Sequence, residues 1–211
     1  MQKNRKLAVA GMAFCGLLAA GLAQTQAQTE TMSFFLTSAG SGNGADLGGI
    51  DGADAICQNL AEGVDQGGHT WRAYLSTQGS DGENARDRIG TGPWFNANGT
   101  RVATDVDNLH STLNRLSVFT ALDERGRRIP GSGYAPNRHD ILTGTQEDGT
   151  AYPDGADMSC SNWTSSSDDG KARVGHHDYA AWNSAHDSRG CSQAALISSG
   201  GDGLFYCFAV Q

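Results

Sequence analysis

The chain has 211 residues and a formal net charge of −8, and 29 of its residues are glycine. That glycine content is roughly twice the usual ~7% and follows no fixed period, which indicates many tight turns and excludes solenoid arrays. An acidic surface repels phosphate backbones and anionic lipids, so nucleic acids and membrane surfaces are poor partners.

The first 27 residues carry the pattern of a signal peptide. Three basic residues lie within the first six positions, and an uncharged run over 7–23 follows and ends in small residues. Export machinery and signal peptidase recognise this arrangement. The run is about 17 residues long, at the short limit for spanning a bilayer. We therefore expect cleavage after Ala23 or Ala27, no membrane insertion after cleavage, and a secreted or periplasmic location.

Removal of this leader leaves a chain long enough for one domain with its own core. We expect a polar lead-in over residues 28–32 and a single domain over 33–211. The leader holds three basic and no acidic residues, so the mature chain keeps 12 basic and 23 acidic residues, a net charge of −11. Such acidity suits cations or neutral polar ligands, although solubility alone is a sufficient explanation for it.

The first half of the domain predicts a strand, a helix and a second strand. Residues 33–38 (SFFLTS) are β-prone and predict the first strand. After a Gly-rich loop, Asp51 is expected to cap a helix whose apolar residues recur at three- and four-residue spacing up to Val64. Asp54 lies in its first turn, where a carboxylate favours the positive end of the helix dipole. Residues 71–76 alternate apolar and polar side chains, which predicts a half-buried strand.

The second half predicts turns, short strands and a long polar loop. The Asn-Gly step at 98–99 lies between β-prone runs and indicates a hairpin. Residues 118–122 predict a strand that leads into a turn at 124–127, and residues 203–210 (GLFYCFAV) predict the closing strand. Between positions 143 and 201 the chain is rich in Gly, Asp and Ser. We expect a long loop there, which in a compact domain is usually functional.

Four cysteines follow the leader: Cys57, Cys160, Cys191 and Cys207. An even number in an exported chain indicates two disulfides, for which three pairings are available. The paired short cysteine spacings that mark most zinc sites are missing from the sequence. Cys57 lies on the apolar face of the predicted helix, so we expect it to point into the core.

Several short motifs succeed one another along residues 33–211. They are GGIDGADAICQNLAEG, HTWRAYLST, RHDILTGTQEDGT, CSNWT, the cysteine at 191 and LFYCFAV. Their order and the cysteine placement resemble the C-type-lectin-like fold, in the branch that contains collagen endostatin domains and related bacterial secreted lectin-like proteins. The resemblance implies an α+β domain with mixed antiparallel sheets, one or two helices, long polar loops and two disulfides.

The resemblance also implies a disulfide pairing. In that family the first cysteine pairs with the last and the second with the third, which implies Cys57–Cys207 and Cys160–Cys191 here. A core-facing cysteine on the predicted helix and another on the closing strand agree with the first pair.

The function that the resemblance implies is a binding module. We expect it to bind carbohydrate, with a glycan or a cell-surface or extracellular protein as partner. We do not expect an enzyme, because the chain lacks Gly-x-Ser-x-Gly, His-Glu-x-x-His and a phosphate-cradling loop. Two alternatives stay open: a module that binds a surface or matrix protein, and a metal-dependent exported hydrolase.

The ligand site is expected in the polar stretch between residues 154 and 191. A sugar needs polar partners for its hydroxyls and a flat apolar face for its ring. The residues that offer these groups are Asp154, Trp182, Asn183, His186 and Asp187. The alternative is that these side chains only order the loop.

Calcium is the cofactor that the resemblance raises, and a solvated loop without a metal is the alternative. Calcium-dependent lectins carry Glu-Pro-Asn or Gln-Pro-Asp before the second cysteine and Trp-Asn-Asp before the third. This chain departs from both patterns, with Tyr-Pro-Asp at 152–154 and Trp-Asn-Ser at 182–184. Calcium takes six to eight oxygen ligands, of which the chain offers only some in this stretch. Those oxygen ligands are Asp154, Asp157, Asn183 and Asp187.

A second group combines imidazoles with carboxylates, which can hold zinc or transfer protons. The zinc site of endostatins uses histidines near the mature N-terminus, and this chain has none there, so that site does not carry over. The alternative is that these side chains bond to the loop backbone. Taken together, the candidate metal ligands are Asp154, Asp157, His176, His177, Asp178 and Asp187.

Overall fold

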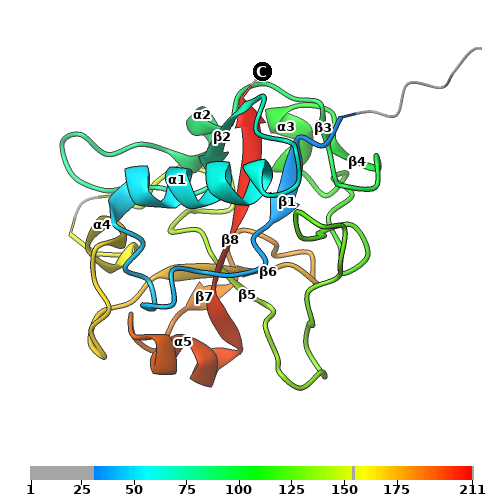
Figure 1. Ribbon diagram of the computed structural model, residues 1–211. Helices are drawn as coiled ribbons and strands as arrows, with labels where there is room; N and C mark the ends of the chain where they lie inside the picture. The colour runs from blue at the N-terminus through cyan, green and yellow to red at the C-terminus, as the bar shows by residue number, and fades with distance from the viewer. Residues whose placement is uncertain (1–30, 154, 211) are drawn as a thin grey trace, which may run out of the picture.

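The computed structural model describes residues 31–153 and 155–210 (Figure 1). The predicted signal peptide over 1–27, most of the predicted lead-in over 28–32 and the candidate ligand Asp154 lie outside the described residues. Within the described part of the chain, no helix has the length and apolar character needed to cross a membrane.

The described residues form an α+β domain of short elements, which confirms the predicted class. The strands are β1 (Phe34–Leu36), β2 (Thr70–Ala73), β3 (Trp94–Phe95), β4 (Arg101–Ala103), β5 (Asp140–Leu142), β6 (Arg173–His176), β7 (His186–Asp187) and β8 (Gly201–Val210). The helices are α1 (Gly49–Glu62), α2 (Ala85–Arg88), α3 (Val106–Leu109), α4 (Cys160–Trp163) and α5 (Gln193–Ser199).

Strand β8 organises the main sheet. Its C-terminal half pairs antiparallel with β1 and β2, and its N-terminal half runs parallel to β5. Strand β6 then pairs antiparallel with β5, and β7 with β6. In Figure 1, β8 (red) runs through the molecule from α5 to the C-terminus, and α1 crosses in front of it. The parallel β5–β8 pair makes the sheet mixed, and the remaining pairs are antiparallel as expected.

Both faces of β8 are buried, which explains why its sequence is almost continuously apolar. Phe205, Cys207 and Ala209 face the core that α1 covers. The alternate residues, including Tyr206 and Phe208, face a second core that contains the β3–β4 hairpin. The domain therefore has two apolar layers with β8 between them.

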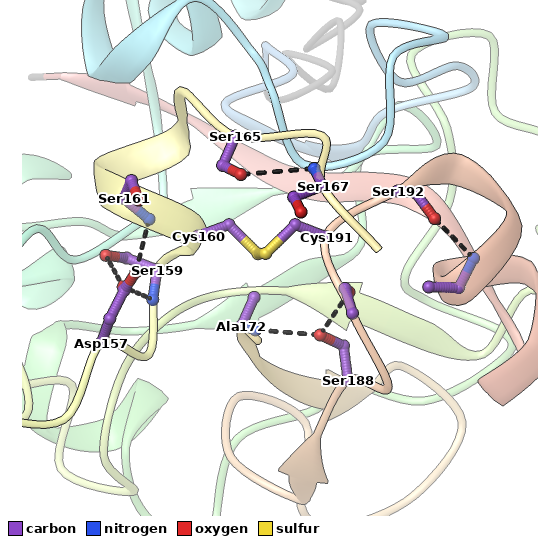
Figure 2. Close-up of a disulfide and its surroundings, with 12 residues drawn as sticks. Asp157, Ser159, Cys160, Ser161, Ser165, Ser167, Ala172, Ser188, Cys191 and Ser192 are labelled. Atoms are coloured by element: carbon purple, nitrogen blue, oxygen red, sulfur yellow. Dashed lines mark hydrogen bonds between the residues drawn. A yellow bond between two sulfur atoms is a disulfide. The ribbon is translucent and has the colours of Figure 1, made fainter. Parts of the chain in front are cut away.

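Both predicted disulfides are confirmed. Cys57–Cys207 joins α1 to β8 across the first core, with 5.6 Å between the Cα atoms. Cys160–Cys191 joins α4 to the segment before α5, with 5.7 Å between the Cα atoms (Figure 2). The second bridge therefore fixes both ends of the segment that carries β6 and β7.

Helix α1 begins two residues before the predicted cap. Gly48 is the N-cap, with a left-handed φ of 79° that glycine adopts without strain, and Asp51 lies inside the first turn. The prediction that Asp54 lies in the first turn is wrong, because α1 begins at Gly49 and Asp51 is the acidic residue of that turn. Asp54 has a different role. It is buried and accepts hydrogen bonds from the Ala73 backbone N–H at 2.8 Å and from Arg88 at 2.7 Å. This carboxylate therefore ties α1 to β2 and α2.

Two of the predicted strands differ from the structure. Residues 118–122 form a turn, in which the backbone N–H of Ala121 donates to the Ser117 carbonyl, and only Leu122 makes an isolated bridge, to Arg128. The predicted strand over 71–76 ends at Ala73. Its half-buried alternation is confirmed within β2, but the residues that follow, Tyr74 to Ser76, are all buried. The turn predicted at 124–127 and the hairpin around 98–99 are both confirmed.

The polar stretch between 143 and 201 is not one continuous loop. It contains α4, β6, β7 and α5, and its strands extend the main sheet. Polar composition hid these elements, because β6 and β7 are only four and two residues long. This extension brings distant polar residues to one edge of the sheet.

Candidate functional site

Trp182 and Asn183, two of the predicted ligand residues, lie inside the protein. Trp182 is 3% exposed, and its ring packs against Tyr74 at 4.9 Å and Tyr206 at 5.4 Å between centroids. The side-chain amide of Asn183 donates to the Tyr74 hydroxyl at 3.1 Å and to two backbone carbonyls. A Cβ at Gly175 would meet the Trp182 carbonyl oxygen at 1.9 Å, so only glycine lets β6 pass this segment so closely.

Asp187 and Asp157 are occupied by partners within the protein. Asp187 accepts hydrogen bonds from Lys171 at 2.9 Å and Arg173 at 3.1 Å. Partial burial favours a higher pKa for Asp187, but the bonds to these two cations outweigh it and hold the pKa below its ordinary value. Asp157 accepts from the backbone around Cys160, as Figure 2 shows. The structure therefore does not gather the oxygen ligands proposed for calcium within the described residues.

Three neighbouring strands bring a different set of residues together. Asp140 begins β5 and lies directly opposite His176 at the end of β6. His186 begins β7 and pairs with Val174 of β6. His139 precedes Asp140 along the chain. We call His139, Asp140, His176 and His186 the His/Asp tetrad.

The tetrad is centred on one carboxylate oxygen. Oδ1 of Asp140 lies 3.1 Å from Nε2 of His139, 3.2 Å from Nε2 of His176 and 3.3 Å from Nε2 of His186. Potential ligand atoms of His139, Asp140 and His176 all lie within 4.8 Å of one another. The rings of His139 and His176 are stacked, with centroids 4.3 Å apart and planes 9° from parallel.

Burial leaves the polar atoms at the centre of the tetrad without hydrogen bonds. Asp140 is 3% exposed, and neither of its carboxylate oxygens has a hydrogen-bond partner among the described residues. Nε2 of His176 is also buried without a partner. Burial and the neighbouring His139 lower the pKa of His176, which favours its neutral form. A buried carboxylate without hydrogen bonds is costly and needs an explanation.

The outer nitrogens of two tetrad histidines face acceptors. Nδ1 of His186 lies 2.9 Å from the Asp187 carbonyl oxygen, and Nδ1 of His139 lies 3.5 Å from Oδ1 of Asp178. Oδ2 of Asp178 in turn accepts a hydrogen bond from the Ser132 backbone N–H at 2.6 Å. The hydrogen bond to the Asp187 carbonyl orients His186 so that Nε2 faces the centre, whereas Nδ1 of His139 and Oδ1 of Asp178 are buried without a hydrogen bond among the described residues.

The sequence pattern predicted only part of this site. It proposed His176 as a metal ligand and His186 as a ligand-binding residue, and the structure brings the two together. It proposed Asp178, which contacts His139 from outside the tetrad, and His177, which is fully buried and whose pKa burial lowers. It did not predict His139 and Asp140. The only local pattern there is a histidine and an acid directly before two apolar residues.

A groove of about 560 Å³ lies beside the tetrad, between residues 110–117 and 178–184. Hydroxyl and amide side chains form one wall: Ser111, Thr112, Asn114 and Ser117. The other wall carries Tyr179, which is 56% exposed, and Trp182 lines the groove from the core side. The Tyr179 ring meets His176 edge-on at 5.9 Å between centroids, so the groove and the tetrad share this aromatic wall.

A second hollow of about 680 Å³ lies near α1 and α2. Its charged groups already have partners, since Arg72 and Arg88 both bind Asp54 and Arg88 also binds Glu83. Ser111, Asn114 and Ser117 of the groove also hydrogen-bond within the protein. The difference between the two hollows is the exposed ring of Tyr179, because no described aromatic residue lines the second hollow. The groove beside the tetrad is the better candidate binding site.

Fold and site together define a two-disulfide α+β domain with a polar groove and an adjacent histidine-rich cluster. No protein-family model and no curated protein matches this chain. The function is therefore argued from the geometry.

Proposed function

We propose that the protein is an exported, non-catalytic, lectin-like binding module that recognises a glycan in the groove between residues 110–117 and 178–184. The observation that carries this proposal is the pairing of a hydroxyl- and amide-rich wall with the exposed ring of Tyr179. Sugars need this combination, because their hydroxyls require hydrogen-bond partners while their CH faces pack on aromatic rings.

The rest of the fold supports such a module. Trp182 and Asn183 sit behind the groove and hold its inner wall in place through the buried contacts with Tyr74. Two disulfides are typical of domains that work in oxidising compartments, in agreement with the predicted signal peptide. The acidic surface also favours a neutral polar ligand over an anionic one.

A glycan array probed with the mature protein, residues 28–211, tests the proposal. We expect binding to a restricted set of neutral glycans in calcium-free buffer, with no gain on addition of calcium, because the described groove residues do not gather calcium ligands. Binding to no glycan, together with capture of a protein partner, would instead favour the module that binds a surface or matrix protein.

A further inference from the structure

We propose that the His/Asp tetrad binds one divalent transition-metal ion of the zinc type. None of the four tetrad residues lines the groove, although Tyr179 of the groove contacts the rings of His139 and His176. The metal proposal therefore does not require a glycan to bind. Four side chains contribute one ligand atom each: Nε2 of His139, His176 and His186, and a carboxylate oxygen of Asp140.

The spacing of these atoms suits a tetrahedral ion. Zinc bound at about 2.0–2.1 Å places its tetrahedral ligand atoms about 3.3 Å from one another. The three distances from Asp140 Oδ1 to the imidazole nitrogens are 3.1, 3.2 and 3.3 Å. Three edges of the tetrahedron are therefore already present, and they meet at the carboxylate. The ligand atoms of His139, Asp140 and His176 also lie within 4.8 Å of one another, a group that does not include His186. Binding one ion therefore requires His186 to move closer and the stacked rings of His139 and His176 to tilt apart, because each imidazole lone pair lies in its ring plane.

Hydrogen bonding within the protein does not account for this arrangement. Three imidazole nitrogens approach Asp140 Oδ1, yet neither oxygen of this 3% exposed carboxylate accepts a hydrogen bond among the described residues. A cation at the centre satisfies the carboxylate and gives the inward lone pairs of neutral imidazoles a partner.

The donor set selects the class of metal. Three imidazole nitrogens and one carboxylate oxygen suit zinc and similar transition metals, whereas calcium takes six to eight oxygen ligands. The tetrad therefore favours a transition metal over calcium, for which the sequence suggested other ligands.

The outer contact of His186 matches that of a metal-bound histidine. Such histidines usually donate the second ring N–H to a carbonyl or carboxylate, which leaves the first nitrogen free for the metal. The Asp187 carbonyl is placed to accept from His186 Nδ1 at 2.9 Å, and Asp178 lies 3.5 Å from His139 Nδ1. The first contact is a hydrogen bond that directs Nε2 of His186 toward the centre, and the second brings a carboxylate close to His139 without a hydrogen bond.

The test measures zinc binding directly. Mature protein, residues 28–211, is stripped with a chelator, dialysed and titrated with zinc chloride by calorimetry, and bound metal is counted by mass spectrometry. We expect one zinc per chain, and a Tm raised by about 5–10 °C when free zinc exceeds the dissociation constant about 100-fold. Calcium chloride at the same concentrations is expected to give no saturable binding.

Matched variants assign the ligands. His186→Ala, at a side chain that is 42% exposed, and the near-isosteric Asp140→Asn should each weaken zinc binding by at least about 100-fold. His69→Ala, a histidine outside the tetrad, should bind zinc as the wild type does. If Asp140→Asn does not fold, the zinc affinity of His186→Ala alone decides whether the tetrad binds the ion. Absence of stoichiometric zinc in the wild type, or wild-type affinity in His186→Ala, would overturn the proposal.

Discussion

Replacing Cys57 and Cys207 together by alanine is expected to lower the free energy of unfolding by about 5 kcal/mol. The bridge closes a loop with a sequence separation of 150 residues, and in the chain-entropy model a longer loop restricts the unfolded chain more strongly. Both cysteines are fully buried between α1 and β8, so removing their sulfur atoms also loosens the packing of the first core. Denaturation in urea without reductant measures the change.

The second bridge provides the matched control. Cys160–Cys191 has a sequence separation of only 31 residues, for which the same model gives about 4 kcal/mol. We therefore expect the variant that lacks Cys160 and Cys191 to be destabilised, but less than the first. Equal midpoints for the wild type and the Cys57→Ala/Cys207→Ala variant would contradict the role assigned to the longer bridge.

Trp182→Ala is expected to destabilise the protein by about 3–5 kcal/mol, because it removes a large ring from a closed aromatic cluster. Trp182 is 3% exposed and packs against Tyr74, Tyr206 and His110. For a domain of this size the change corresponds to a fall in Tm of roughly 6–20 °C. Calorimetric melting of the purified variant measures it.

The neighbouring aromatic residue separates a structural role from ligand contact. Tyr179 is 56% exposed, so Tyr179→Ala should change stability by no more than about 0.5 kcal/mol. If Trp182→Ala melts at the wild-type temperature, Trp182 is not a core residue as described above. That result would instead favour the sequence-based prediction that its ring stacks on a sugar.

Local patterns in the sequence predicted the elements that form the frame of the domain. The three- and four-residue spacing predicted α1, the β-prone runs predicted β1 and β8, and the Asn-Gly step predicted the β3–β4 hairpin. These signals depend on a few adjacent residues, so they are visible without the fold. The disulfide pairing came only from family resemblance, and the structure agrees with it.

Those local patterns could not predict contacts between residues that are far apart in the sequence. His139 and His186 are separated by more than forty positions, and only the β5–β6–β7 ladder makes them neighbours. The polar character of Asn183 and Asp187 suggested ligand contacts, but their hydrogen bonds run to Tyr74, Lys171 and Arg173 within the protein. Residue type alone does not separate a side chain that binds a ligand from one that orders a loop.

The most direct test of the proposed function is the affinity of one array-selected glycan for Tyr179→Ala, measured by titration calorimetry. Loss of the ring should weaken binding by about 0.5–1.5 kcal/mol, roughly 2- to 13-fold. Tyr134→Ala, at an aromatic residue that is 63% exposed and lies outside the groove, is the control and should bind as the wild type does. Wild-type affinity in Tyr179→Ala, or an equal loss in both variants, would contradict glycan recognition in this groove.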